Sequence, residues 1–464
     1  FGGETIKDLG QRAKAGAEFL IPRGYKIYKQ GEVATFINGR AYKNSEFKEN
    51  GTPIIRIQNL KGVDSGKIVY SDLVLDDDKY IEKDDLIYAW SATFGPHIWK
   101  GPRSIYHYHI WKIVCNENLI DKYFFFYKLK YISDRISAQG TGSIFSHITK
   151  TLMENQEIGI PQLNEQRRIS QILKSLDDKI ELNNTINKNL EEIAQALFKR
   201  WFVDFEFPNE DGEPYKTSGG EFEDSELGPI PKGWKPGTIG ELGEVAGGAT
   251  PSKKVDAYYT ERGIPWITPK DLSKTTNKYI ARGEIDITEE GFRNSSVKLL
   301  PKDTVLFSSR APIGYIAIAK NEVTTNQGFK SVIPLEHIGS EFVYYLLKSN
   351  VEKIENRASG STFKEISGSE MRKVPVLIPP KDVLAKFNEI VEPLGRLMQK
   401  CEEEIEALTQ IRDTLLPKLM SGEIRVPVEQ EQAQEQTREQ KHSIYQPSYN
   451  DLPMAAESKA DYRT

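Results

Sequence analysis

The two halves of this chain carry the same short motifs in the same order, at a register of about 210 to 220 residues. The first half begins with Ile21-Pro-Arg-Gly-Tyr-Lys26 and continues Gly31-Glu-Val-Ala. The second half begins with Ile230-Pro-Lys-Gly-Trp-Lys235 and continues Gly243-Glu-Val-Ala. A repeat of this length predicts two copies of one structural unit, because 464 residues exceed what a single hydrophobic core normally holds.

Within each repeat, apolar runs end in polar groups. Residues 53–60 correspond to 264–272, and residues 83–91 correspond to 302–310. Each run is typical of a strand that delivers polar side chains to a loop. Both repeats close with an apolar strand ending in proline, after which a long helical stretch begins. The repeat unit is therefore predicted to be a β-rich globule followed by a helix.

The helical stretches carry a seven-residue apolar repeat that predicts a coiled-coil seam. The first seam is Ile169, Leu176, Asn183, Leu190 and Leu197, with Ile172, Ile186 and Ile193 on interleaved positions. The second seam is Phe387, Leu394, Cys401, Leu408 and Leu415, flanked by Ile405 and Ile411. We expect an α+β fold in which two tandem β-rich domains are separated by two long helices that form an antiparallel coiled coil with pseudo-two-fold symmetry. A helix of this length spans roughly 55 to 60 Å and could act as a ruler, although a plain strut in an oligomer has the same pattern.

The net charge of −5 is unevenly distributed. Residues 1–160 carry 22 lysines and arginines against 19 acidic residues, and residues 224–380 carry 21 against 19, so both β-rich blocks are mildly basic. The acidity belongs to residues 161–223 and 381–464. Weak basicity argues against strong DNA binding by the chain alone, so a DNA-binding role would depend on a few placed residues and on partner subunits.

Neither a membrane nor an oxidising compartment is indicated. We find no apolar run long enough to cross a bilayer and no signal peptide, and the two cysteines, Cys115 and Cys401, are far apart. We expect a cytoplasmic protein.

The doubled pattern resembles the specificity subunits of type I restriction-modification enzymes, over nearly all of residues 21–425. The resemblance depends on the Ile-Pro-X-Gly-Tyr/Trp-Lys starts, on Ser359-Gly-Ser-Thr-Phe-Lys364 with its counterpart Gly140-Thr-Gly-Ser-Ile-Phe145, and on Asn164-Glu-Gln-Arg-Arg-Ile169. The second helix begins Pro380-Lys-Asp-Val-Leu-Ala-Lys-Phe387 and lacks the Glu-Gln-Arg-Arg of the first. We therefore expect the partner contacts of the two ends to differ.

The resemblance implies a domain plan and a set of partners. It implies residues 1–160 as target-recognition domain 1, 161–206 as a central helical spacer, 207–228 as a linker, 229–380 as target-recognition domain 2, 381–425 as a C-terminal helical spacer and 426–464 as a disordered tail. Each domain would read one half of a bipartite double-stranded DNA target, and the helices would recruit two methyltransferase subunits. Restriction subunits that translocate DNA would join this core. The chain itself would be non-catalytic and without a cofactor, while S-adenosylmethionine, ATP and Mg would bind to the partner subunits.

Base reading needs hydrogen-bonding side chains at strand ends, with lysine or arginine nearby for phosphates. In the first domain the candidates are Arg40, Tyr42, Lys43, Arg56, Gln58, Asn59, Ser91, Thr93 and His97. In the second they are Thr250, Ser252, Lys253, Lys254, Thr268, Lys270, Ser309 and Arg310. Each of these could equally be a solvated loop residue, and only their recurrence at strand ends favours the group. Residues 139–143 and 359–364 could bring backbone N–H groups to a phosphate, or could simply form turns.

His107 and His109 would place two imidazoles on one strand face, but no third ligand lies at a usual spacing, so no metal site is predicted. An aromatic strand with hydrogen-bonded histidines is the alternative.

The sequence also bears on two other classes of function. A methyltransferase or nuclease is disfavoured because the chain has neither a Gly-x-x-x-x-Gly-Lys-Ser/Thr phosphate loop nor an Asn/Asp-Pro-Pro-Tyr/Phe tetrapeptide. A coiled-coil scaffold whose globules bind protein is compatible with the negative net charge. Such a scaffold would bind its partner with little salt dependence, unlike a DNA reader.

Overall fold

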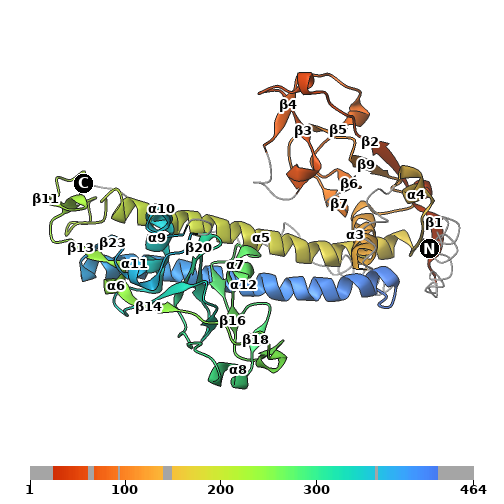
Figure 1. Ribbon diagram of the computed structural model, residues 1–464. Helices are drawn as coiled ribbons and strands as arrows, with labels where there is room; N and C mark the ends of the chain where they lie inside the picture. Colours follow the sequence, from red (N-terminus) through yellow and green to blue (C-terminus); the bar gives the residue numbers. More distant parts are fainter. Residues whose placement is uncertain (1–23, 61–66, 92–94, 139–148, 361–363, 427–464) are drawn as a thin grey trace, which may run out of the picture. The chain divides into compact units, whose positions relative to one another are not determined.

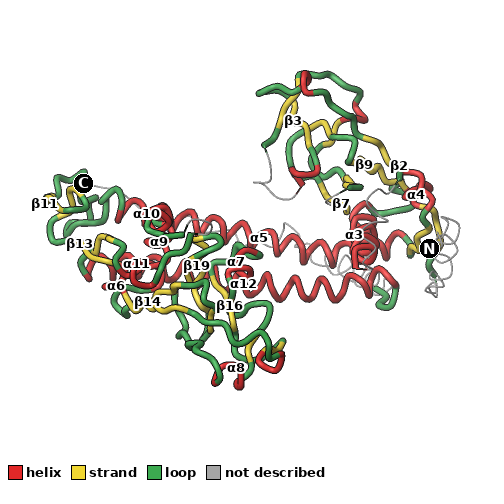
Figure 2. The backbone as a smooth tube through the Cα atoms, viewed as in Figure 1, coloured by secondary structure: helices red, strands yellow, loops and turns green. Residues whose placement is uncertain are grey.

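The computed structural model describes residues 24–60, 67–91, 95–138, 149–360 and 364–426. The chain forms two compact units, Phe1–Asp177 with Gln410–Thr464, and Asp178–Thr409. We call them unit 1 and unit 2. The boundaries between them fall inside two long helices, α5 (Leu163–Phe202) and α12 (Lys381–Ser421). Each unit therefore combines a globular part, built of short strands and loops, with a stretch of both helices (Figure 2).

The globular part of unit 1 contains two four-stranded sheets, in the orders β2-β9-β6-β7 and β4-β3-β8-β5 (Figure 1). The described strands are β1 (Lys26–Lys29), β2 (Ala34–Asn38), β3 (Thr52–Ile55), β4 (Val69–Ser71), β5 (Tyr80–Ile81), β6 (Leu86–Ala89), β7 (Gly95–Ile98), β8 (Ser104–Tyr106), β9 (Ile110–Cys115) and β10 (Glu157–Ile160). The shorter helices are α2 (Gln30–Val33), α3 (Lys122–Ala138) and α4 (Lys150–Asn155).

The globular part of unit 2 contains a five-stranded sheet in the order β14-β22-β19-β20-β17, with four two-stranded pairings around it. Its described strands are β11 (Phe222–Ser225), β12 (Gly228–Pro231), β13 (Lys235–Thr238), β14 (Gly243–Gly247), β15 (Tyr259–Thr260), β16 (Trp266–Ile267), β17 (Tyr279–Ile280), β18 (Asp286–Ile287), β19 (Val305–Ser309), β20 (Ile313–Ala319), β21 (Thr324–Thr325), β22 (Lys330–Pro334) and β23 (Pro375–Ile378). The shorter helices are α6 (Ile239–Leu242), α7 (Pro269–Ser273), α8 (Glu289–Arg293), α9 (Ser340–Ser349), α10 (Val351–Asn356) and α11 (Gly368–Arg372).

The same topology occurs in both units, as the tandem repeat predicts. The order β2-β9-β6-β7 corresponds to β14-β22-β19-β20, and the antiparallel pair β1–β10 corresponds to β13–β23. Strand β3 pairs in parallel with β8, as β16 does with β21. The residue in a left-handed conformation before β6 also recurs before β19, with φ of 71° at Asp84 and 67° at Asp303. The α+β prediction of two tandem domains is confirmed.

The predicted seam residues of both helices are buried or half-buried. Within unit 2 the two helices run antiparallel, because Asn183 donates a hydrogen bond to Glu404 at 2.8 Å while Phe198 packs against Phe387. Within unit 1, Arg412 forms an ion pair with Asp177 at 2.8 Å. No helix in the described ranges is long and apolar enough to cross a bilayer.

The predicted interleaved positions of the seam are partly wrong. Ile193 is 55% exposed and Ile411 is 47% exposed, so neither lies in the seam. The buried positions are instead Leu173 and Ala194 in α5. Each lies four residues after a residue of the seven-residue repeat, whereas the predicted interleaved positions of α5 lie three residues after one. This spacing places the second line on the side of the helix that faces the core.

A cluster of buried polar residues joins the globular part of unit 2 to both long helices. Lys278 forms an ion pair with Glu341 of α9, and the Tyr345 hydroxyl donates to Glu191 of α5 at 2.7 Å. Glu402 of α12 accepts the backbone N–H of Lys278 at 2.7 Å. We call Glu191, Lys278, Tyr279, Glu341, Tyr345 and Glu402 the buried polar cluster. It fixes the globular part against specific turns of both helices.

We expect the stability of unit 2 to depend on pH through Glu402. Burial raises the pKa of this carboxyl from 4.5 to about 7, and the Lys278 N–H and the Lys320 ammonium only partly oppose the effect. A raised folded-state pKa means that the contribution to stability is complete below pH 4.5 and is lost as the pH rises through about 7. The variant Glu402→Gln should therefore gain stability relative to the wild type as the pH rises through this window. Urea unfolding on both sides of the window measures the difference, with Glu403→Gln at the exposed neighbouring position as the control; equal pH profiles for all three proteins would contradict it.

Candidate nucleic-acid interface

Four sequence-distant segments meet at the strand ends of unit 1: residues 39–43, 56–59, 90–91 and 107–109. Backbone hydrogen bonds hold them together. The Arg40 N–H donates to Tyr106 at 3.1 Å, the His107 N–H to Ile55 at 2.9 Å and the Trp90 N–H to His109 at 3.1 Å. The structure therefore brings together the first-domain candidates Arg40, Tyr42, Lys43, Arg56, Gln58, Asn59 and Ser91.

Arg40 is already occupied by a partner within the chain. Its guanidinium donates two hydrogen bonds to Glu46, at 2.7 and 3.1 Å, and lies 5.2 Å from the centre of the Tyr42 ring. Glu46 also accepts the backbone N–H of Lys43 at 2.8 Å, and these contacts, with that from Arg40 the largest, lower its pKa. This arrangement neutralises Arg40 and leaves it a positioning role.

Arg56 has no carboxylate partner in the described part of the chain. One guanidinium nitrogen donates to the Lys67 carbonyl at 2.9 Å, while the buried Nε has no hydrogen-bond partner among the described residues. The Asn59 side chain accepts the Arg56 backbone N–H at 3.0 Å and so shapes the turn. Gln58 is exposed beside it. Within the described ranges, Arg56 is thus a cation of this interface that no carboxylate neutralises.

Two first-domain candidates remain, His97 and Thr93. His97 is part of strand β7, where it pairs with Ile87, and burial lowers its pKa. Thr93 lies outside the described residues. The sequence predicts His107 and His109 on one strand face, but the two residues lie in the turn between β8 and β9. Within the described ranges, no cluster of three His, Cys, Asp or Glu side chains is placed to hold a metal ion.

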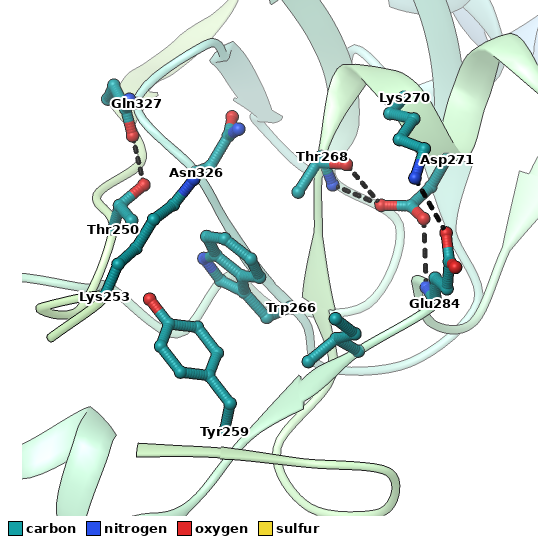
Figure 3. Close-up of a pocket in the computed structure, with 11 residues that line it drawn as sticks. Thr250, Lys253, Tyr259, Trp266, Thr268, Lys270, Asp271, Glu284, Asn326 and Gln327 are labelled. Carbon is teal, nitrogen blue, oxygen red and sulfur yellow. Dashed lines mark hydrogen bonds and ion pairs between the residues drawn. The ribbon is translucent and has the colours of Figure 1, made fainter. Parts of the chain in front are cut away.

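In unit 2 the equivalent strand ends form a cleft of about 500 Å³ (Figure 3). Four predicted residues, Thr250, Lys253, Thr268 and Lys270, contribute to its walls. Ser252 and Lys254 are exposed beside Lys253 but do not line the cleft. The remaining lining residues were not among the candidates predicted from the sequence; they are Tyr259, Trp266, Asp271, Glu284, Ile285, Asn326 and Gln327.

Two aromatic rings stand in the middle of the cleft. The rings of Tyr259 and Trp266 meet edge to face with their centres 5.7 Å apart, between Thr250 and Gln327 on one side and Thr268 and Asp271 on the other (Figure 3). The Trp266 indole N–H donates to Ala249 at 3.1 Å and the Tyr259 hydroxyl to Pro251 at 2.7 Å, so both rings are fixed by the chain. Aromatic side chains held in this way supply rigid apolar contact area next to polar groups.

The polar wall of the cleft is pre-organised. Asp271 accepts hydrogen bonds from the Thr268 hydroxyl at 2.6 Å and from the Glu284 backbone N–H at 2.9 Å. Glu284 pairs with Lys274 and, at 3.3 Å, with Lys270, and these two contacts lower its pKa, that of Lys274 most. Lys253 has no carboxylate partner among the described residues. It therefore gives the cleft an ammonium group that no described carboxylate neutralises.

The last two candidates of unit 2 are held within the protein. Ser309 is fully buried, and its hydroxyl accepts a hydrogen bond from Lys330 at 3.4 Å, so its side chain offers no surface to a base. Arg310 is half-exposed and pairs with Glu365 at 3.3 Å. These two residues support the strand ends and do not line the cleft.

Similarity to known proteins agrees with this geometry. The family described as type I restriction modification DNA specificity domain matches the chain twice, over residues 22–192 and 231–407. The chain belongs to this family. Both members of the repeat are thus specificity domains, and each match covers a globular part together with most of the helix that follows it.

Curated relatives of this specificity-domain protein are specificity subunits of type I restriction enzymes. The type I restriction enzyme HindI specificity subunit of Haemophilus influenzae is 26% identical over 478 residues, covering 86% of this chain and 99% of that protein. The MjaIX specificity subunit of Methanocaldococcus jannaschii is 42% identical over 193 residues, which is 41% of this chain and 44% of that protein, so this match spans less than half of either. The crystal structure of an S subunit of a type I restriction-modification system from M. genitalium has the same fold, with a TM-score of 0.57 at 17% identity, over 85% of this chain and 96% of that one.

Proposed function

We propose that this chain gives a type I restriction-modification complex its DNA specificity, with each unit reading one half of a bipartite double-stranded target. The observation that carries the proposal is the recurrence of one set of polar strand ends in both units, with different side chains in each. Sequence-specific reading needs hydrogen-bonding groups held on rigid elements, which both interfaces supply. Arg56 and Lys253, which have no carboxylate partner in the part of the chain that the structure describes, are suited to phosphate contacts beside them.

We further propose that the two long helices set the distance between the half-sites and recruit two methyltransferase subunits. The support for a docking role is a second apolar stripe on the helices, outside the seam. It includes Ile193, Ile390 and Leu397, which are 46 to 55% exposed. Restriction and translocase subunits would complete the complex, and these partners would bind S-adenosylmethionine, ATP and Mg. The chain would then be the non-catalytic reader, and catalysis would belong to its partners.

Methylation mapping tests this function directly. The partner methyltransferase is expressed with and without this chain on random-sequence DNA, and the modified bases are located by long-read sequencing. A two-part motif with a fixed gap, present only with this chain, is the expected result. An active methyltransferase whose motif does not depend on the chain would overturn the proposal.

Replacing Lys253 by alanine should weaken DNA binding of the assembled complex at all sequences and make it less sensitive to salt. Each phosphate contact that is lost removes one released counterion, so the slope of log affinity against log salt should fall by about 1. Fluorescence anisotropy over a salt series measures this slope. The matched control is Lys216→Ala, an exposed lysine that lies outside the cleft. Equal slopes for Lys253→Ala and the wild type would exclude a phosphate contact by Lys253.

A further inference from the structure

The turn between the last two strands of each interface is held in the same way in both units. In unit 1 it comprises residues 107–109, between β8 and β9; in unit 2 it comprises residues 326–328, between β21 and β22. The His107 N–H donates to Ile55 at 2.9 Å, and the Asn326 N–H donates to Ile267 at 3.0 Å. The far end of each turn accepts a strand-end N–H, from Trp90 at 3.1 Å in unit 1 and from Ser309 at 2.7 Å in unit 2.

A glycine packs directly against the start of each turn. A Cβ atom on Gly39 would overlap the His107 carbonyl oxygen, and one on Gly248 would overlap the Asn326 carbonyl oxygen. The residues that follow these glycines complete the support, since the Arg40 N–H donates to Tyr106 and the Ala249 N–H to Thr325. Because backbone lies against backbone, the turn cannot shift without moving its neighbours. Each unit therefore presents the turn on a rigid frame.

The side chains on this common frame differ completely. Unit 1 presents His107 and Tyr108, of which Tyr108 is 41% exposed, and unit 2 presents Asn326 and Gln327. Burial, the neighbouring His109 and Arg56, in that order, lower the pKa of His107 to about 4. At neutral pH its imidazole is uncharged, with one nitrogen able to donate and the other able to accept. It is thus a group suited to a base edge and not to a phosphate.

The two polar atoms of the Asn326 amide also have different roles. Its Oδ1 accepts the Gly328 N–H at 2.8 Å, which closes the turn and orients the side chain. Its Nδ2 has no hydrogen-bond partner among the described residues, and the side chain lines the cleft (Figure 3). A fixed amide donor of this kind complements acceptors on a base edge, such as N7 or O6 of guanine.

We propose that these two turns determine specificity, with His107 and Tyr108 reading base edges of one half-site and Asn326 and Gln327 reading base edges of the other. The inference rests on the proposed function and narrows it to a pair of residues in each unit. Two domains that recognise different base sequences need different hydrogen-bonding side chains in the same position. The two turns meet this need, since one backbone geometry carries different polar side chains in each unit.

Replacing the side chains of the two turns tests the inference. The double variant His107→Asn/Tyr108→Gln and the single variant Asn326→Asp are each co-expressed with the partner methyltransferase, and the methylated motif is mapped. Asn326→Asp keeps the size of the side chain and the acceptor that closes the turn but replaces the donor. Each variant should change one or two base positions in one half-site, by roughly 10- to 100-fold in discrimination, and leave the other half-site unchanged. The two variants must affect different halves.

A pair of neighbouring glycines tests the frame itself. Gly248→Ala should disturb the turn and relax the half-site that Asn326→Asp affects. Gly247→Ala is the matched control, because a Cβ there meets no atom within 4 Å. Circular dichroism and co-purification with the methyltransferase confirm that each variant folds and assembles.

The outcomes separate the inference from the function on which it rests. If the wild type directs no two-part motif, the proposed function fails. If the wild type does so and the turn variants methylate the same motif, or lose methylation with no change of motif, the turns do not determine specificity. A change confined to the expected half-site by each variant supports both.

Discussion

Replacing Lys278 by methionine is expected to lower the free energy of unfolding by about 3–5 kcal/mol. Lys278 is 3% exposed and forms an ion pair with Glu341, which is also buried. Its ammonium donates to the Tyr345 hydroxyl at 2.9 Å and lies 4.6 Å from the centre of the Tyr344 ring. Removing the ammonium leaves the Glu341 carboxylate with the Tyr279 hydroxyl as its remaining side-chain partner among the described residues, and an uncompensated buried charge is costly.

The loss should come from the unpaired charge and not from the missing packing. The double variant Lys278→Met/Glu341→Gln should therefore recover much of the stability, because a buried pair replaced by neutral groups costs less than one broken partner. Urea-induced unfolding of the full chain measures both variants, with Lys353→Met at an exposed position of α10 as the control. A Lys278→Met variant as stable as this control would show that the ion pair contributes nothing to folding.

The buried polar cluster also explains why unit 2 is compact across its helices. Glu191 belongs to α5 and Glu402 to α12, yet both bind groups of the globular part. Gly395 of α12 belongs to the same arrangement, since a Cβ there would overlap the Tyr279 hydroxyl and the Glu341 carboxylate. The helix backbone and the cluster are thus in direct contact, and both helices contribute residues to the main hydrophobic core of unit 2.

The repeat and the main seam could be predicted because both are periodic in sequence. The second line of the seam could not, since a period of seven fits a partner three or four residues away equally well. Ile193 has a more apolar side chain than Ala194, so the pattern favoured the isoleucine, and only the packing of α5 within unit 2 shows that the alanine is the buried one. The exposed isoleucine then belongs to a separate apolar stripe.

The sequence predicts which strand ends form the interface, but not which hydrogen-bond and ion-pair partners the candidate side chains have. Glu46 forms an ion pair with Arg40 because the short helical turn Asn44–Glu46 brings the carboxylate back towards the strand end. Residue types alone do not reveal this pairing. Ser309 is buried beneath Lys330, although its neighbour Arg310 is half-exposed. The turns at His107 and Asn326 were not predicted as DNA-reading elements. Their position depends on hydrogen bonds to Ile55 and Ile267, which are far away in the sequence. Aligning residues 107–109 with residues 326–328 in the two repeats would have shown that the side chains of the two turns differ.

Replacing Phe387 by alanine should destabilise the chain by about 3–5 kcal/mol, through lost burial and the cavity left behind. Phe387 is fully buried on α12, and its ring centre lies 4.8 Å from that of Phe202 and 5.8 Å from that of Trp201, both at the end of α5. It also meets Phe342 of α9 at 6.4 Å, so one side chain joins both helices to the globular part.

Ile390 supplies the matched control for this prediction, because it lies three residues further along the same helix but is 46% exposed. Ile390→Ala should cost far less stability, since little apolar surface is returned to water. Its effect should appear instead in assembly, as weaker co-purification with the methyltransferase, if the exposed stripe docks that partner. Denaturant unfolding and pull-down of the two variants therefore separate the seam from the docking stripe. Equal losses of stability for Phe387→Ala and Ile390→Ala would show that the two faces of α12 are not distinguished in this way.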